Sequence, residues 1–329
     1  MSKWVKSSLL ILVFASFAGC TPEVLTDNSL TAVRNDLGAA DGRRLCVSTT
    51  GMIGNLVETV GGEDVHSVTL MGAGVDPHLF KPTRDDVVLV RQANALFYNG
   101  LHLEGRMGAV FNHLPPSQLK LVIGEWVWEQ HGRSDGDSLH AEDPHIWMDV
   151  SLWAEAPLEI ARTLAILQPE NKTVLLGRGE KLRKQLLALD EYGQKLIKTI
   201  PENQRVLITS HDAFQYFGKR YNIEVRGVQG MSTESEAGLA TISELVNMIV
   251  DREIPTIFVE SSVSSNTMRA LVEGCAARGK QIQLGGPLYA DALGPSGTYE
   301  GTYIGMMDHN FRVITAGLGG TVTDKRFAP

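Results

Sequence analysis

The residues best suited to chemistry in this chain are two histidines that each follow an aspartate and a proline. One Asp-Pro-His motif ends at His78 and the other ends at His145. Proline fixes its own φ and pushes the preceding residue toward extended geometry, so each motif forms a stiff bend that points an imidazole away from the local chain. Because neutral imidazole is a common metal ligand, the repeated motif indicates a metal site more than two isolated surface histidines.

Two further residues complete the candidate set. His211 stands in a Ser-His-Asp tripeptide, and Asp291 lies in a late loop. Taken singly, both have ordinary explanations, since Ser-His-Asp can cap a helix and aspartate is common in loops. Together with His78 and His145 they give three imidazoles and one carboxylate. This donor set suits tetrahedral zinc or, if the carboxylate binds through both oxygens, manganese. We therefore predict that the four residues form one site for Zn²⁺ or Mn²⁺.

The elements expected around these residues are alternating strands and helices. Short apolar runs at 44–50, 65–71 and 95–98 are separated by helical patterns, which predicts a mainly parallel α/β sheet. Ligands of such sheets bind in loops beyond the carboxyl ends of the strands, and His78 follows the run at 65–71.

The alternation is interrupted by residues 169–200, where leucines recur at helical spacing. An unbroken helix of this length would reach about 48 Å, enough to cross one lobe and join it to another. Gly177, Gly179 and Gly193 weaken the case for an unbroken rod. Because the strand–helix alternation restarts at 205–209, we predict two α/β lobes, each a mainly parallel sheet flanked by helices, joined by one long linking helix.

The N-terminus has the features of a bacterial lipoprotein signal. Two lysines precede an apolar run that is too short to span a bilayer, and the run closes on small residues and Cys20. In a lipobox this cysteine receives diacylglycerol and becomes the mature N-terminus; an ordinary cleaved signal with an incidental cysteine is the alternative. We therefore predict an extracytoplasmic protein, in the periplasm or at the cell surface, attached to a bacterial membrane through its N-terminal lipid only.

These signals divide the 329-residue chain into five parts. The predicted boundaries are 1–19 for the signal peptide, 20–42 for a polar tether, 43–168 for the first lobe, 169–201 for the linking helix and 202–329 for the second lobe. The formal net charge of −8 argues against nucleic acid as a partner. Cys46 and Cys275 could pair in an oxidising compartment or remain as two buried thiols.

Other polar residues have supporting roles in this prediction. Residues 126–142 are polar, carry His131 and His140, and are expected to form a mobile surface loop in which the two histidines are solvated or bind metal weakly. Thr83 and Asp86 have capping-box spacing, with aspartate in place of glutamate. Five carboxylates could fix imidazole tautomers by accepting the second ring N–H: Asp76, Asp143, Asp149, Asp212 and Glu260.

Several motifs occur in a characteristic order. They are D-P-H-x-F-x-P-T-x-x-D at 76–86, H-x-W-x-D at 145–149, T-S-H-D-A-F at 209–214, G-M-S-T-E at 230–234 and the Asp291 loop. With the lipobox, they resemble the zinc- and manganese-binding lipoproteins of bacterial ABC importers, the cluster A-I or TroA-like solute-binding family. The resemblance covers essentially the whole mature chain.

This resemblance implies a two-lobed fold with a rigid linking helix and an ABC permease as partner. The family's ligand positions fall on His78, His145, His211 and Asp291. Members with histidine in the third position generally bind zinc or both zinc and manganese. The long histidine-rich loop of some zinc-specific members is reduced here to His131 and His140, so the metal stays open. The chain is expected to act as a monomer that captures and delivers an ion without catalysis.

Two other functions stay open at this stage. A secreted zinc-dependent hydrolase could use the three histidines as ligands and Asp291 or a glutamate as base, although the His-Glu-x-x-His motif of zincins is absent. A pair of lobes could also bind an organic ligand such as a metal chelate. Nothing in the chain argues for a role as a surface adhesin.

Overall fold

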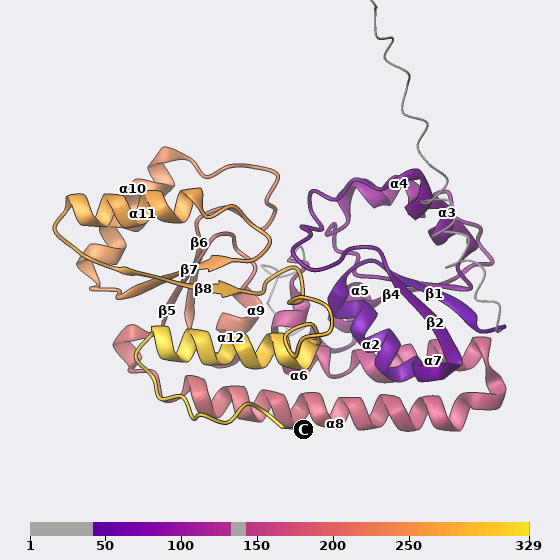
Figure 1. The fold of residues 1–329 in the computed structure, drawn as a ribbon. Helices are drawn as coiled ribbons and strands as arrows, with labels where there is room; N and C mark the ends of the chain where they lie inside the picture. Colours follow the sequence, from indigo (N-terminus) through magenta and orange to yellow (C-terminus); the bar gives the residue numbers. More distant parts are fainter. Residues whose placement is uncertain (1–41, 133–142, 329) are drawn as a thin grey trace, which may run out of the picture.

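The computed structural model describes residues 42–132 and 143–328. The predicted signal peptide with Cys20, nearly all of the predicted tether, and His140 lie outside these residues. The described chain forms two α/β lobes that rest side by side on one long helix (Figure 1). Among the described residues, no helix combines the length and the apolar character needed to cross a membrane.

The first lobe is built on a four-stranded parallel sheet with strand order β2-β1-β3-β4. Its strands are β1 Arg44–Ser48, β2 Val65–Thr69, β3 Ala95–Tyr98 and β4 Leu119–Val122. Its helices and turns are α2 Gly51–Gly61, η1 Gly62–Asp64, α3 Arg84–Gln92, η2 Gly105–Met107, α4 Gly108–Phe111, α5 Ile123–Val127 and η3 Trp128–Gly132. The predicted capping box is confirmed: Thr83 Oγ1 accepts from the Asp86 backbone N–H, and Asp86 accepts from that of Thr83.

The second lobe repeats the design with strand order β6-β5-β7-β8, again parallel. Its strands are β5 Val206–Thr209, β6 Glu224–Gly227, β7 Thr256–Glu260 and β8 Gln283–Leu288. Its helices and turns are η7 Glu202–Gln204, α9 Gln215–Tyr221, α10 Leu239–Asp251, α11 Asn266–Ala277 and α12 Tyr303–Gly317. The two matching sheets confirm the predicted fold class.

Short helices lead from the first lobe to the linking helix. They are η5 Ile146–Met148, α6 Val150–Trp153, α7 Ala156–Leu167 and η6 Pro169–Asn171. Residues 150–167 form two helices, α6 and α7, rather than one continuous helix. Pro157 lacks the N–H that would bond to the Trp153 carbonyl, so α6 ends and α7 starts anew with this proline in its first turn.

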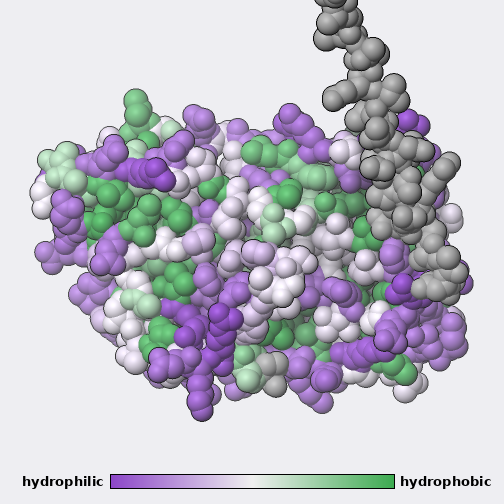
Figure 2. All heavy atoms as spheres, in the orientation of Figure 1, coloured by the Kyte–Doolittle hydropathy of each residue, from purple (hydrophilic) through white to green (hydrophobic). Residues whose placement is uncertain are grey.

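The linking helix α8 runs over Lys172–Ile197 without a break and lies beneath both lobes (Figure 1). Its glycines serve close packing. A Cβ on Gly179 would lie 2.8 Å from the Pro157 carbonyl oxygen, and one on Gly193 would lie 2.3 Å from the Phe311 ring. These positions let α7 and α12 approach the α8 backbone. In the hydropathy view the lower edge, where α8 lies, is mostly hydrophilic (Figure 2).

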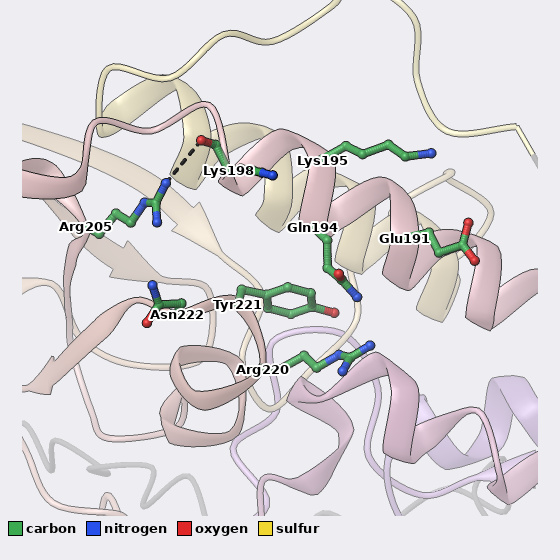
Figure 3. A pocket seen from close by; sticks show the side chains of 8 residues that line it. All are labelled: Glu191, Gln194, Lys195, Lys198, Arg205, Arg220, Tyr221 and Asn222. Carbon is green, nitrogen blue, oxygen red and sulfur yellow. Dashed lines mark hydrogen bonds between the residues drawn. The ribbon is translucent and has the colours of Figure 1, made fainter.

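Helix α9 is anchored to α8 through a buried carboxylate. Asp190 accepts hydrogen bonds from the Arg220 guanidinium and from the Tyr221 hydroxyl, at 2.9 Å for the latter. Both donors point toward α8 in the groove of about 520 Å³ that opens between the two helices (Figure 3). The Arg220 guanidinium in this groove is therefore neutralised by Asp190 of α8, and its role is structural.

The lobes share one continuous hydrophobic region, the interlobe seam, on the side of α8 and α12. Its buried aromatic members include Trp147, Trp153, Phe217, Tyr303 and Phe311. Trp153 and Tyr303 rings lie 6.1 Å apart between centroids, and the Tyr303 hydroxyl donates to the Trp147 carbonyl oxygen at 2.6 Å. The seam therefore holds the lobes together by apolar contact.

Two expectations need correction or completion. The predicted surface loop is wrong for residues 126–132, which are helical with Val127 and Trp128 buried; the rest of that loop lies outside the described residues. Trp128 packs edge-on against Tyr216 of the second lobe, a long-range contact that draws this segment inward. Cys46 and Cys275 are both free and buried, so they do not form a disulfide.

Candidate metal centre

His78 reaches the centre from the loop that follows β2. Residues 72–74 of this loop are exposed, whereas His78 is only 5% exposed. Asp76 Oδ1 accepts the backbone N–H of His78 at 2.9 Å, which closes a local turn around Pro77. The stiff bend expected from Asp-Pro-His is therefore present, and its imidazole points inward.

His145 is held more tightly. Asp143 Oδ1 accepts the His145 backbone N–H at 3.0 Å and lies 2.7 Å from its Nδ1. Asn99, at the end of β3, donates to the Pro144 carbonyl oxygen at 3.0 Å and fixes the same loop. With Nδ1–H donated to a carboxylate, the Nε2 lone pair of His145 faces the centre.

His211 follows β5 and depends on a carboxylate from the neighbouring strand β7. Glu260 Oε1 accepts the His211 backbone N–H at 2.9 Å, and Glu260 Oε2 lies 2.6 Å from its Nδ1. Both side chains are fully buried. The arrangement repeats that of His145, so the Nε2 atom of His211 is again the one left for a ligand.

Asp291 completes the group from the loop after β8. Its Oδ2 lies 3.1 Å from His211 Nε2 and 3.6 Å from His78 Nε2, and its Oδ1 lies 3.5 Å from His145 Nε2. One possible ligand atom from each of the four residues lies within 4.8 Å of the others. This geometry suits a single ion held by three nitrogens and a carboxylate.

Several atoms of this group are buried without a hydrogen bond. Within the described part of the chain, both Asp291 oxygens and His211 Nε2 lack a well-directed hydrogen bond, and their nearest compensation is the ion-pair contact of 3.1 Å between Asp291 Oδ2 and His211 Nε2. Burying an unsatisfied polar atom is unfavourable, and burying a charge without compensation is more so. A bound cation would satisfy all three atoms together.

The protonation of the centre is uneven. Burial lowers the pKa of His78 to about 4, which leaves it neutral. Burial alone would also lower the pKa of His211, but the Glu260 and Asp291 carboxylates outweigh it and raise the pKa well above its usual value. For Asp291, burial would raise the pKa, but the facing His211 and His145 rings hold it below its usual range.

All four sequence-predicted residues thus come together, two from each lobe. Of the five carboxylates proposed to orient them, Asp143 and Glu260 contact ring nitrogens, whereas Asp76 contacts the backbone N–H of His78 and the Thr233 hydroxyl rather than a ring. Asp149 instead caps α6 through the backbone N–H groups of residues 151 and 152, and Asp212 accepts from a glutamine side chain.

Other histidines and supporting residues fall outside the predicted set. His131 is exposed and its ring lies against Trp126. Sequence reasoning missed Asn99 and also Trp147, whose indole N–H donates to the Ala290 carbonyl oxygen at 2.9 Å, next to Asp291. The position of Asn99 at a strand end and the aromatic in H-x-W-x-D were the available signals.

Two characterised proteins are similar in sequence to most of this chain. It is 42% identical over 280 residues to the zinc-binding protein TroA of Treponema pallidum (strain Nichols), covering 85% of this chain and 90% of TroA. It is 38% identical over 280 residues to the manganese-binding lipoprotein MntA of Bacillus subtilis (strain 168), covering 85% and 91%.

A solved structure also matches this fold. The solved structure of the periplasmic zinc binding protein TroA from Treponema pallidum matches with a TM-score of 0.80 and 41% identity, over 84% of this chain and 99% of that one. Residues 46–317 match the family described as ZnuA, zinc-uptake complex component A, periplasmic, and the chain therefore belongs to this family.

Proposed function

We propose that this chain is an extracytoplasmic solute-binding protein that captures a divalent transition metal, zinc or manganese, between its lobes and delivers it to an ABC permease. The observation that carries the proposal is the convergence of four buried donor residues, two from each lobe, with unpartnered atoms at their centre. The relatives named above bind zinc in one case and manganese in the other, which supports both cargoes.

The proposed ligands are the Nε2 atoms of His78, His145 and His211 and the carboxylate of Asp291. In this assignment the Nδ1–H groups of His145 and His211 are donated to carboxylates, which orients both rings. The centre holds one ion rather than an organic chelate, because its donor atoms lie within 4.8 Å of one another.

Capture rather than catalysis follows from the coordination. A catalytic zinc keeps one position open for water or substrate, whereas here four protein side chains surround the ion. All four residues are also almost completely buried, which leaves no approach for a substrate to be hydrolysed. The names of the relatives describe binding proteins, in agreement with this interpretation.

The remaining parts of the proposal concern attachment and assembly. Residues 1–19 would be removed as a signal peptide, Cys20 would carry the lipid, and residues 20–42 would tether the lobes at 43–168 and 202–329. One copy of the chain supplies every donor, so the protein would work as a monomer. Release would occur when a membrane permease opens the centre.

The test begins with elemental analysis of protein purified without added metal, followed by competition titrations with Zn²⁺ and Mn²⁺. His78→Ala and Asp291→Ala proteins should each lose more than about 100-fold in affinity, beyond the range typical of residues that only support a ligand. His113→Ala is the matched control, because His113 is exposed and its ring bonds to the Ala109 carbonyl oxygen of the preceding helix α4.

Unchanged affinity in the folded ligand variants would overturn the site. Turnover of ester or phosphate substrates by the metal-loaded protein would instead revive the hydrolase. Circular dichroism and thermal unfolding of each variant distinguish loss of a ligand from loss of the fold.

A further inference from the structure

A hydrogen bond joins the two lobes beside the candidate metal centre. Thr233, in the loop between β6 and α10, donates its hydroxyl to Asp76 Oδ2 of the first lobe at 2.5 Å. The other carboxylate oxygen of Asp76 accepts the backbone N–H of His78. A second-lobe hydroxyl is thus connected, through one carboxylate, to the loop that carries a proposed ligand.

His78 is the least anchored of the three imidazoles. His145 and His211 each lie within 2.7 Å of a carboxylate through Nδ1. In the described part of the chain, His78 Nδ1 has no such partner, and its loop is held by Asp76 instead. His78 is also 5% exposed, against 0% for the other two rings.

The segments around this bond are open to solvent. Residues 72–74 on one side and 234–236 on the other are exposed, and an added Cβ on Gly74 would have only the Ser261 carbonyl oxygen, 3.9 Å away, within contact distance. Figure 1 shows both loops on the face of the molecule away from α8. The opposite side is the interlobe seam, which is continuous apolar core. Local opening therefore requires the least free energy at the His78 loop.

An ion cannot reach or leave the four donors without some movement, because all of them are buried. We propose that Thr233 is a positioning residue that sets the rate of metal exchange: its bond to Asp76 must break before the His78 loop can swing away from the ion. This inference rests on the proposed metal-binding function and adds to it a route, along the His78 side, and a residue that controls it.

Such a role has a specific kinetic signature. Neither Thr233 nor Asp76 is a proposed ligand, so the bond between them is expected in the loaded protein as well, and its loss should lower the barrier for entry and for exit alike. In Thr233→Val, which keeps the shape but removes the hydroxyl, the association and dissociation rates of Zn²⁺ or Mn²⁺ should both rise about tenfold. The equilibrium affinity should change by less than about threefold.

The experiment is stopped-flow mixing of metal with protein, and of loaded protein with excess chelator. Thr233→Ser restores the hydroxyl and should return both rates toward wild type. Ser235→Ala is the matched control, because Ser235 is exposed in the same loop and its side chain makes no hydrogen bond among the described residues.

Wild-type rates in Thr233→Val would overturn the inference while leaving the proposed function intact. So would a loss of affinity with an unchanged association rate, since that would mean a damaged site. Failure of the wild-type protein to bind either metal would instead defeat the proposed function, and the two failures are therefore distinguishable.

Discussion

Two buried regions join the lobes, and they differ in almost every physical respect. The interlobe seam is aromatic and apolar; its Tyr303 hydroxyl is hydrogen-bonded, and among the seam aromatics named above only the Trp153 indole N–H is buried without a partner in the described structure. The candidate metal centre is made of ionisable groups, and both Asp291 oxygens lack a hydrogen-bond partner in the described structure. Burial of the apolar seam favours contact between the lobes even without a ligand. Burial of the Asp291 carboxylate, by contrast, is unfavourable until a cation binds.

The difference shows that one region holds the two lobes together and the other binds the metal. The seam keeps the lobes in place and so pre-organises donors from both of them. The metal centre can then contain buried ionisable groups that destabilise the metal-free protein, because apolar burial in the seam offsets their unfavourable free energy. Changes at the centre should alter metal affinity and leave the fold intact, and changes at the seam should do the opposite.

The largest effect that tests this division is expected at Glu260. Glu260→Gln keeps the shape but removes the charge that orients and polarises His211, so metal affinity should fall by about 10- to 100-fold. Titration calorimetry measures the affinity, and thermal unfolding in the absence of metal should show no matching loss. Asp143→Asn is the parallel change at His145; affinities within threefold of wild type in both proteins would refute the proposed role.

Proton release should sharpen the same comparison. His211 has a raised pKa and carries a proton in the metal-free protein, while His78, with a pKa of about 4, does not. Metal must displace the proton on His211, so binding near pH 7 should release about one proton and the affinity should rise about tenfold per pH unit. Below pH 5, His78 begins to protonate as well, and the affinity should fall more steeply as pH decreases.

Calorimetry in two buffers of different ionisation enthalpy counts these protons. In Glu260→Gln the pKa of His211 should be lower and fewer protons should be released. Binding without proton release in the wild-type protein would contradict the assignment.

The smallest effect is expected in the seam. A Cβ on Gly193 would meet the Phe311 ring, so Gly193→Ala should destabilise the protein by about 1–2 kcal/mol after the gain in helix propensity. Gly177→Ala on the same helix meets nothing within 4 Å and should stabilise by about 0.5–1 kcal/mol. Urea unfolding compares the two. Metal affinity should match wild type in both, and a large drop in Gly193→Ala would show that the regions are coupled.

Features set by local covalent geometry were predictable from the sequence. Proline stiffens each Asp-Pro-His bend wherever it occurs, and Thr83 caps its helix through contacts only three residues long. Strand–helix alternation likewise depends on short-range periodicity, which is why the two lobes and the linking helix could be expected. The chemistry of three imidazoles and a carboxylate is a property of the residue types alone.

Features that depend on strand order and distant packing were not. Asp212 adjoins His211 in sequence, yet Glu260 orients its ring, because β5 and β7 are neighbours in the sheet. Trp128 is buried by contact with the second lobe, which no local pattern records. The bond from Thr233 to Asp76 also joins segments far apart in the chain. The sequence by itself determined which side chains could bind metal; tertiary structure decided which groups orient and enclose them, because those partners are neighbours only in the folded chain.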